Sequence, residues 1–387
     1  MFKPHPEERR IAQSAADTAI YDLLVIGGGV NGVGIANDAA GRGLSVLLCE
    51  QHDLASHTSS ASSKLVHGGL RYLEHYEFRL VREALGEREV LLKKAPHIIW
   101  PLRFVLPHRP HLRPRWMLRA GLFLYDHLGK RTTLPGSTGG PLNGQGPLKP
   151  EIDYAFEYSD CWADDARLVV LNAVQAASLG ADIRPYTRCE SASRVGDLWQ
   201  VDLLVGEHVR ERVQARALVN AAGPWAARVM ERVVSTRSPY GVRLVQGSHI
   251  VVPELYHGRQ AYILQNEDER IVFVLPYEGG YSLIGTTDVD YQGDPARVEP
   301  TDGEVEYLLE VVNGHFKRQL KHSDICHRFS GVRPLISDAS EADPSAVSRD
   351  YSLTLHGDAS EAPLLAVYGG KLTTYRRLAE AAVDKLK

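Results

Sequence analysis

The chain has 387 residues, 44% of them hydrophobic and 24% charged, which are the proportions of an ordinary globular protein. Its formal net charge of −4 argues against a general nucleic-acid binder, and no apolar run is long enough to cross a membrane. The length suits more than one standard domain, or a single composite α/β body. Four scattered cysteines without a C-x-x-C pair predict neither a disulfide framework nor a zinc site, and favour a reducing compartment.

The first segment of the chain is predicted to lie outside any folded domain. Residues 1–20 mix acidic and basic side chains and lack the apolar stretch of a signal peptide. We therefore expect a flexible leader here.

Residues 21–50 predict a strand, a glycine-rich turn, a helix over 31–42 and a second strand at 45–49. The turn carries a G-x-G-x-x-G pattern made by Gly27, Gly29 and Gly32. Such glycines permit a tight turn, close approach of the backbone to a pyrophosphate, and close packing of helix on strand. The helix start around Asn31 favours that anion, and Glu50 stands where a ribose hydroxyl is expected. A dinucleotide site is predicted, with an ordinary βαβ turn as the alternative.

A polar loop and a helix follow. Five serines and a threonine lie between Ser56 and Ser63, so the loop offers many hydroxyl and backbone donors. Taken alone, these residues also suit a solvated loop with helix-capping serines. The spacing of apolar residues between Phe78 and Leu92 predicts an amphipathic helix that ends before Pro96.

Residues 93–135 differ in composition from the rest of the chain. Nine lysines and arginines face a single acid, Asp126, and large apolar side chains such as Trp116 and Phe123 are interleaved with them. A segment of this kind suits an anionic membrane surface, and equally suits a solvated basic face backed by core aromatics. The Gly- and Pro-rich residues 136–150 predict a surface loop.

The nucleotide-binding body is predicted to resume at residue 164. The expected elements are a helix over 164–180, a strand at 182–186, a hairpin over 198–215 and a buried strand that ends in a turn at 221–224. Gly223 in that turn allows close approach to a dinucleotide, or simply close packing.

Short apolar runs between residues 239 and 329 predict a separate β-rich layer that covers a substrate. A strand at 364–368, a Gly-Gly turn and a helix beginning at Lys371 then return to the nucleotide-binding body. The start of that helix would form another anion site.

The sequence lacks a Walker-A loop and the H-E-x-x-H and G-x-S-x-G patterns, which argues against several common enzyme classes, and no metal site is expected. NAD dehydrogenases usually keep their fingerprint in a compact cofactor domain. The order found here, with nucleotide-binding and β-rich segments interleaved, is typical of flavoproteins of the glutathione-reductase type.

Longer stretches of the sequence are similar to one family. They are SSASSKLVHGGLRYLEHYEFRLV, FEYSDCWADDARLV, VNAAGPW, QGSHIVVP, AYILQNEDERIVFVLPY, IGTTDVDY, GVRPL and YGGKLTTYR. Together they resemble the FAD-dependent glycerol-3-phosphate dehydrogenases, and most of all the bacterial aerobic, respiratory enzyme. The resemblance covers nearly the whole chain from residue 21 onward. Family members normally continue with a helical C-terminal cap domain, which this chain is expected to lack, so that quinone access, dimerisation and activity stay open.

The resemblance implies an α/β fold in which a Rossmann-like FAD-binding domain is interleaved with a β-rich substrate domain, as in glycine oxidase and D-amino-acid oxidase. The FAD-binding parts would be residues 21–92, 164–238 and 330–387, and the substrate or membrane-facing parts would be residues 93–163 and 239–329. The implied reaction is oxidation of sn-glycerol 3-phosphate to dihydroxyacetone phosphate by hydride transfer to flavin N5, with electrons passed to membrane quinone. The implied location is the cytoplasm, peripherally bound to the anionic inner face of the cytoplasmic membrane, and a homodimer is one expected assembly.

The resemblance also implies site residues. Arg71, Arg333 and Lys371 are expected to bind the phosphate-bearing substrate, with Tyr72 beside Arg71, because guanidinium and ammonium groups suit phosphate. Either His67 or His249 could accept or relay the proton of the C2 hydroxyl, or be a packed structural histidine, and Arg333 could stabilise the alkoxide. The residues expected to hold FAD are Gly27, Gly29, Asn31, Gly32, Glu50, Thr58, Ser59, Ser62, Ser63, Lys64, Gly223, Gly370, Lys371, Leu372 and Thr373.

Three alternatives stay open on the sequence alone. An oxidase of the same fold would pass its electrons to oxygen, although the basic aromatic segment favours the membrane enzyme. An amine oxidase of the glycine or sarcosine type would not need Arg71, Arg333 and Lys371. A catalytically silent FAD-binding fragment would bind the flavin without reducing it.

Overall fold

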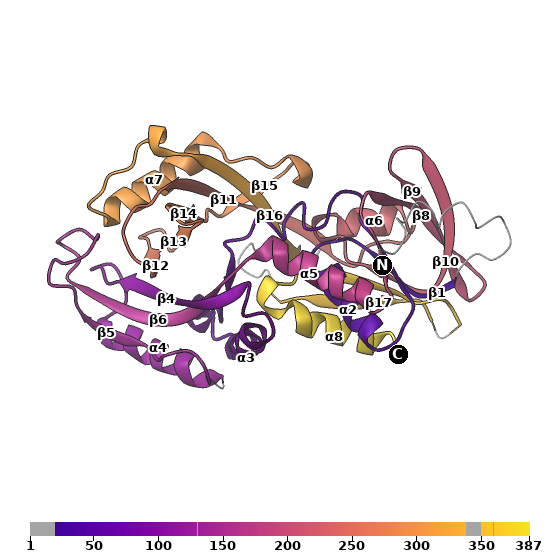
Figure 1. Ribbon diagram of the computed structural model, residues 1–387, viewed down its shortest axis with the longest axis horizontal. Helices are drawn as coiled ribbons and strands as arrows, with labels where there is room; N and C mark the ends of the chain where they lie inside the picture. Colours follow the sequence, from indigo (N-terminus) through magenta and orange to yellow (C-terminus); the bar gives the residue numbers. More distant parts are fainter. Residues whose placement is uncertain (1–19, 130, 338–349, 359) are drawn as a thin grey trace, which may run out of the picture.

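The computed structural model describes residues 20–129, 131–337, 350–358 and 360–387. Two mixed β-sheets lie side by side in it, with helices on their faces (Figure 1). The leader predicted for residues 1–20 lies, apart from Ile20, outside the described residues.

The first sheet has eight strands in the described part of the chain. β1 (Ile20–Ile26) lies in its interior and pairs in parallel with β2 (Val46–Cys49) and with β10 (Val209–Asn220). β10 also pairs in parallel with β18 (Leu364–Tyr368), so that distant parts of the chain meet in this sheet. The other strands are β7 (Asp182–Arg184), β8 (Thr187–Val195), β9 (Leu198–Val205) and β17 (Ser352–His356).

Alternate side chains of β1 face two different layers, as the two-residue period of a strand requires. Leu23 and Val25 pack against the side formed by α2 (Val30–Gly41), α5 (Asp165–Ser178) and α8 (Tyr375–Lys385), which are grouped together in Figure 1. Leu24 and Ile26 face the opposite side, where β8, β9 and α6 (Ala226–Arg232) cover the sheet. Because both faces are buried over residues 23–26, this part of the strand is continuously apolar rather than alternating, whereas the less buried start of the strand contains Tyr21 and Asp22.

The second sheet has ten strands among the described residues. It is built on β11 (Gly241–Pro253) and β16 (His327–Ser337), which pair antiparallel from Gly241 opposite Ser337 to Val251 opposite His327. The other strands are β3 (Leu65–Val66), β4 (Ile99–Pro107), β5 (Thr138–Pro141), β6 (Tyr154–Ala163), β12 (Ala261–Gln265), β13 (Ile271–Tyr277), β14 (Tyr281–Gly285) and β15 (Val289–Tyr291).

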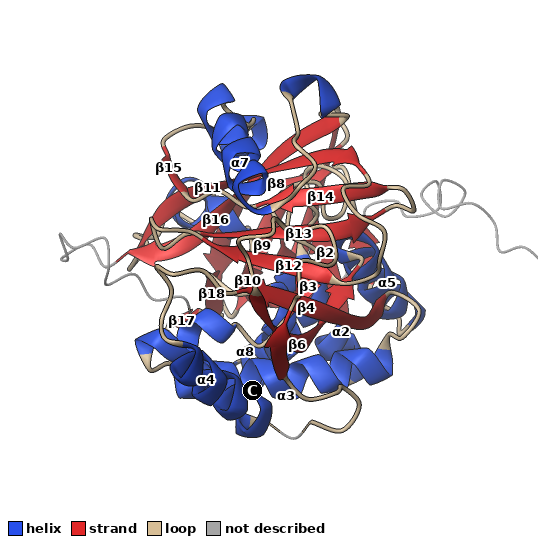
Figure 2. Cartoon of the chain, turned by 90° about the vertical axis from the view of Figure 1, so that its left-hand side faces the viewer, coloured by secondary structure: helices blue, strands red, loops and turns tan. Residues whose placement is uncertain are grey.

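Helices cover both faces of the second sheet (Figure 2). Ile250 and Val252 of β11 pack in a cluster with α7 (Asp302–His315), whereas Val251 packs in a cluster with α3 (Phe78–Lys94) and α4 (Arg115–Leu128). Short 3-10 turns complete the chain: η1 (Leu70–His75), η2 (Gly223–Trp225), η3 (Pro295–Arg297), η4 (His322–Asp324) and η6 (Leu372–Thr374). No helix in the described ranges is both long and apolar enough to cross a membrane.

The structure corrects several details of the sequence analysis. The region 239–329, expected to be strands, also contains the helix α7. The expected hairpin strand at 208–215 and the buried strand after it form the single strand β10. The last helix does not begin at Lys371, which is extended (φ −136°, ψ 150°); a 3-10 turn comes first and α8 begins at Tyr375. Residues 330–337 belong to the second sheet because β16 pairs with β11 along its whole length.

Candidate active site

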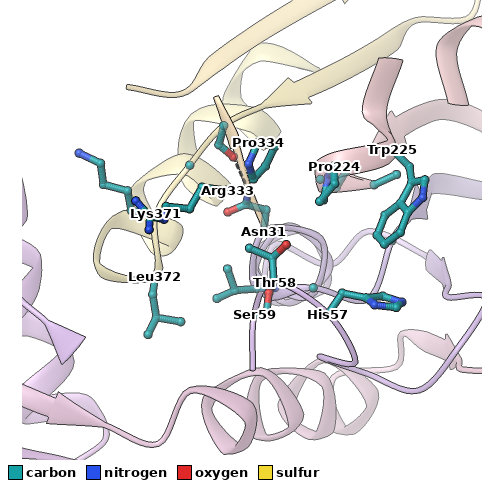
Figure 3. A pocket seen from close by; sticks show the side chains of 18 of the residues that line it. Asn31, His57, Thr58, Ser59, Pro224, Trp225, Arg333, Pro334, Lys371 and Leu372 are labelled. Atoms are coloured by element: carbon teal, nitrogen blue, oxygen red, sulfur yellow. Dashed lines mark hydrogen bonds between the residues drawn. The ribbon is translucent and has the colours of Figure 1, made fainter. Parts of the chain in front are cut away.

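A cavity of about 1100 Å³ is lined by both sheets. Its walls come from the glycine-rich turn after β1, the loop between β2 and β3, η1, the turn after β10, parts of β11 and β16, and the turn after β18. Arg333 and Lys371 lie on one side of this cavity and His57 and Trp225 on the other, with Asn31 between them (Figure 3). The volume exceeds the roughly 300–1,000 Å³ of ordinary small-molecule pockets, and suits a dinucleotide with a second, smaller ligand.

The glycine-rich turn is packed too tightly for larger residues. A Cβ on Gly27, which has φ +117°, would lie 2.5 Å from the carbonyl oxygen of Ala221. A Cβ on Gly32 would lie 1.9 Å from the carbonyl oxygen of Gly27. The absence of side chains at these positions lets α2 pack close to β1 and the turn close to the end of β10, and the start of α2 lies at the cavity wall.

The start of α2 faces the cavity, and its N-cap residue has no side chain to cap the helix. Gly29 is the N-cap residue, and the N–H of Val30 donates to Ser59 Oγ at 2.9 Å. Asn31 Nδ2 donates to the carbonyl oxygen of Gly369 at 3.1 Å, while its buried Oδ1 has no hydrogen-bond partner among the described residues. A helix N-terminus suits an anionic ligand, and the unpartnered acceptor beside it suits a ligand that also carries a hydroxyl or N–H donor.

Glu50 is fixed at the neighbouring end of β2. Its carboxylate accepts hydrogen bonds from the N–H of Gly28 at 2.7 Å and from the N–H of His52 at 2.8 Å. This is the place, beside a glycine-rich turn and at the end of a parallel strand, where the ribose hydroxyls of a dinucleotide bind. The rings of His57 and Trp225, 4.8 Å apart, line the cavity wall nearby.

The serine-rich loop is tied to the rest of the protein by side-chain contacts. Thr58 Oγ1 donates to a backbone carbonyl of β16 at 2.9 Å. Ser62 Oγ and Lys64 Nζ both contact the fully buried carboxylate of Asp165, at 2.7 and 2.6 Å. Because its ammonium pairs with Asp165, Lys64 does not line the large cavity, in contrast to the other four loop residues predicted to hold the cofactor.

His67 is presented to the cavity by the turn after β3. The N–H of the next residue donates to Tyr125 Oη at 2.9 Å and to Asp160 Oδ1 at 3.2 Å, and Asp160 also pairs with the buried Arg88 at 2.6 Å. Burial lowers the pKa of His67 below 6.5, although the negative charge of Asp160 opposes this shift. His67 is therefore neutral at neutral pH and able to accept a proton.

The three cationic residues predicted to bind the substrate are among the lysines and arginines that line the same cavity. Lys371 Nζ lies 4.1 Å from the centre of the Tyr72 ring, which is a cation–π distance. Arg333 Nη2 donates to the carbonyl oxygen of Thr287 at 2.7 Å, and Arg71 of η1 is half-buried in the cavity wall. Guanidinium and ammonium groups arranged in this way suit a phosphate-bearing ligand.

His249 lies behind this wall rather than in it. Its side chain is 2% exposed, stacks on Phe329 with ring centres 4.9 Å apart, and shares a hydrogen bond between Nε2 and Ser63 Oγ at 2.9 Å. Burial, reinforced by the charges of Arg333 and Lys64, lowers the pKa of His249 to about 3. His249 does not line the large cavity, and it is neutral at physiological pH.

Comparison with known proteins settles the fold and the cofactor. The family described as FAD dependent oxidoreductase matches residues 22–376. The chain belongs to this family. The predicted FAD-binding α/β fold and the FAD cofactor are therefore confirmed.

Individual members of the family are close relatives. The chain is 64% identical over 374 residues to a glycerol-3-phosphate dehydrogenase of Pseudomonas aeruginosa, covering 97% of this chain and 73% of that protein. It is 61% identical over 368 residues to the aerobic glycerol-3-phosphate dehydrogenase of Escherichia coli, covering 94% and 73%. The solved glycerol-3-phosphate dehydrogenase of Bacillus halodurans, complexed with FAD, superposes with a TM-score of 0.72 at 30% identity, covering 95% of this chain and 64% of that one. The resemblance seen in the sequence is confirmed, and the chain spans only part of each relative's length.

The residues around the cavity fit FAD. The N–H groups at the start of α2 would hold the pyrophosphate, the buried acceptor Asn31 Oδ1 would take a hydroxyl or N–H of the cofactor, and Glu50 would hold a ribose. The turn after β18, with Gly370 and Leu372, lies beside Asn31 on the side of the cavity away from His57 and Trp225 (Figure 3), and would hold the flavin end.

Most of the predicted site residues meet in this one cavity. Those that line it are Gly27, Gly29, Asn31, Glu50, Thr58, Ser59, Ser62, Ser63, His67, Arg71, Tyr72, Gly223, Arg333, Gly370, Lys371, Leu372 and Thr373. Three predicted residues, Gly32, Lys64 and His249, stand outside the lining. The sequence analysis missed His57 and Trp225, although Trp225 directly follows the turn at 221–224 that was expected to approach a dinucleotide.

Proposed function

We propose that this chain oxidises sn-glycerol 3-phosphate to dihydroxyacetone phosphate and passes the two electrons through FAD to a membrane quinone. The observation that carries the proposal is that Arg71, Arg333 and Lys371 line one cavity together with a neutral histidine, His67. The names of the two bacterial relatives with at least 61% identity, and of the FAD-bound relative, support the same substrate.

The cationic side chains bind and orient the substrate. Arg71 and Lys371 hold the phosphate, and the Tyr72 ring keeps the Lys371 ammonium in place. Arg333, whose guanidinium is anchored on the carbonyl of Thr287, stabilises the negative charge that develops on the C2 oxygen. Substrate that is held by its phosphate thus presents its C2 carbon in one orientation.

Oxidation of the C2 alcohol removes a hydride from carbon and a proton from oxygen. Bound FAD supplies the hydride acceptor, at flavin N5. We assign the proton to His67, because it lines the cavity and is neutral. His249, with a pKa of about 3, is too weak a base, and its role is to hold Ser63 in the cavity wall.

The decisive experiment is anaerobic. The FAD-loaded chain is mixed with glycerol 3-phosphate, and loss of the oxidised-flavin absorbance at about 450 nm is followed. Wild type should bleach, Arg71→Ala and Lys371→Ala should need far more substrate, and the exposed Arg82→Ala should behave as wild type. Flavin that stays oxidised with glycerol 3-phosphate but is reduced by glycine or sarcosine would replace the proposal by an amine oxidase.

The electron acceptor is tested by readmitting oxygen or adding quinone to the reduced protein. Reoxidation by a soluble quinone analogue much faster than by oxygen supports the dehydrogenase. Rapid reoxidation by oxygen with release of peroxide would identify an oxidase instead. Light scattering on the same sample decides whether the chain forms the expected homodimer.

We further propose that α4 rests on the anionic inner face of the cytoplasmic membrane. Leu122 and Tyr125 are its buried residues, whereas Trp116 and Phe123 are 69% and 60% exposed. Exposed aromatic rings on a basic helix suit an anionic interface. The double variant Trp116→Ser and Phe123→Ser should no longer float with anionic vesicles. The control Tyr186→Ser, which replaces a 57% exposed aromatic residue outside α4, should float like the wild type. Equal flotation of both variants would refute this surface.

A further inference from the structure

A buried carboxylate on α7 lies directly behind the residues that hold Arg333. Glu304 is 6% exposed, and its Oε1 accepts hydrogen bonds from Thr287 Oγ1 at 2.5 Å and from Ser248 Oγ at 2.7 Å. Its Oε2 accepts from Gln246 Nε2 at 2.7 Å. A single carboxylate thus joins α7 to β11 and to the loop after β14.

Glu304 also has an ordinary structural role at the start of its own helix. It forms a capping box with Thr301: the Thr301 hydroxyl accepts from the N–H of Glu304, and Glu304 Oε2 accepts from the N–H of Thr301. A capping box needs only one carboxylate oxygen here, and Oε1 is directed to Thr287 and Ser248 instead. The cap therefore does not account for the contact with the loop.

Thr287 connects this carboxylate to Arg333. It is 1% exposed, its hydroxyl donates to Glu304 and accepts from the N–H of Ser248 at 2.9 Å, and its carbonyl oxygen accepts from Arg333 Nη2 at 2.7 Å. The side chain of Thr287 is thus fixed by Glu304 and Ser248, and its backbone carbonyl fixes the guanidinium of Arg333. Loss of the side-chain anchors would free the carbonyl that fixes Arg333.

The guanidinium of Arg333 also packs against a glycine of the neighbouring strand. A Cβ on Gly247 of β11 would lie 2.4 Å from Arg333 Nη2 and 2.4 Å from Thr286 Oγ1. The guanidinium therefore lies against the bare backbone of Gly247, between that strand and the 286–288 loop. Asp288 Oδ1, at 3.6 Å from Arg333 Nη1, lies on the same loop.

We propose that Glu304 is a positioning residue for the substrate site: through Thr287 it fixes the guanidinium of Arg333 in the cavity. The inference rests on the proposed function in that Arg333 is taken to contact the substrate. Glu304 itself touches neither substrate nor FAD. It acts by making the 286–288 loop rigid, so that Arg333 is preorganised before substrate binds.

The test compares two variants that cut the connection with two matched controls. Glu304→Gln and Thr287→Val remove the carboxylate and the hydroxyl of the shared hydrogen bond. Thr301→Ala weakens the same helix cap but leaves the Glu304–Thr287 contact intact, and Thr287→Ser keeps the hydroxyl. All four are prepared with FAD, and flavin content, flavin spectrum and Tm are recorded first.

Stopped-flow reduction by glycerol 3-phosphate then gives the substrate dissociation constant and the limiting rate. Glu304→Gln and Thr287→Val should lower the ratio of rate to dissociation constant by about tenfold, the scale of residues coupled in one hydrogen-bond network. Thr301→Ala should stay within about twofold of wild type even where its Tm falls as far as that of Glu304→Gln. An equal loss in Thr301→Ala and Glu304→Gln would reduce Glu304 to a helix cap and overturn the proposal.

A double-mutant cycle with Arg333→Lys isolates the coupling. If Glu304 acts through the guanidinium, adding Glu304→Gln to Arg333→Lys should cost less than about twofold, against tenfold in the wild-type background. Full additivity would overturn the inference while leaving the proposed function standing. Should glycerol 3-phosphate fail to reduce even the wild type, the proposed function fails, and a crystal structure of Glu304→Gln still decides whether Glu304 positions Arg333, by whether the guanidinium stays on the carbonyl oxygen of Thr287.

Discussion

Acidification from pH 7 to pH 5 should destabilise the folded protein through His249. The imidazole titrates at 6.5 without its folded surroundings, whereas in the folded protein burial lowers its pKa to about 3. Because the folded pKa is the lower one, the unfolded chain takes up the proton first, so stability present above pH 6.5 is lost progressively as the pH falls toward 3. A pH of 5 is about 1.5 units below the pKa of the imidazole in the unfolded chain. At about 1.4 kcal/mol per pH unit, the free energy of unfolding therefore falls by about 2 kcal/mol.

Thermal unfolding of the FAD-loaded protein at the two pH values measures this loss. In a chain of this length, about 2 kcal/mol corresponds to roughly 2–3 °C in Tm. The fall in Tm between pH 7 and pH 5 should be smaller by that amount in His249→Gln, which cannot titrate. His208→Gln, whose side chain is 87% exposed, should match the wild type. An identical fall in His249→Gln and wild type would mean that the buried imidazole is protonated as easily as an exposed one, and the argument from burial would be refuted.

Three further predictions concern single residues of the site and its supports. Gly32→Ala would place a Cβ 1.9 Å from the carbonyl of Gly27, so the purified protein should retain little FAD, measured by its flavin-to-protein absorbance ratio. Asp165→Ala would leave the Lys64 ammonium buried without its carboxylate, and should lower the free energy of unfolding by about 3–5 kcal/mol, or the Tm by roughly 4–6 °C. The double variant Asp165→Asn with Lys64→Met, which removes both charges, should lose less stability. Equal losses in the two proteins would contradict the ion-pair argument. The fall of kcat/KM on the acid side of its pH profile should lie below pH 6.5, since a protonated His67 cannot accept the substrate proton. His67→Asn should lower kcat by about 10²–10⁴-fold and remove this acid-side fall. An unchanged fall in that variant would assign the proton to another group.

The elements that the sequence predicted well are those whose signals are local. The helix that begins beside Asn31 and the helix between Phe78 and Leu92 were found because glycine spacing and apolar periodicity lie within the segments themselves. The helix α7 was missed because it lies in a long run of strand-like segments, although Thr301 and Glu304 at its start have the spacing of a capping box. Lys371 was read as a helix start because glycines precede it, whereas the chain stays extended there and turns later.

The site could be predicted in its residues but not in its pairings. His249 was singled out with His67, yet only the folded structure shows that His249 lies against Ser63, 186 positions away, with a pKa lowered by burial. Lys64 sits in a loop that does line the cavity, and its partner Asp165 is 101 positions away. Such contacts depend on how strands from separate segments are placed, which no spacing within one segment specifies.

The hydrogen bond between Asn31 and the carbonyl of Gly369 joins residues 338 positions apart, both of which line the cofactor cavity. At about 5–20 residues per second, a ribosome needs roughly 20–70 s to make the chain between these two points. During that time the glycine-rich turn after β1 has been made but the turn after β18 has not. For part of that time β1 also lacks its neighbouring strand β10. Flavin can therefore be captured only late in synthesis, and until then the emerging apolar strands are exposed to aggregation and to chaperones.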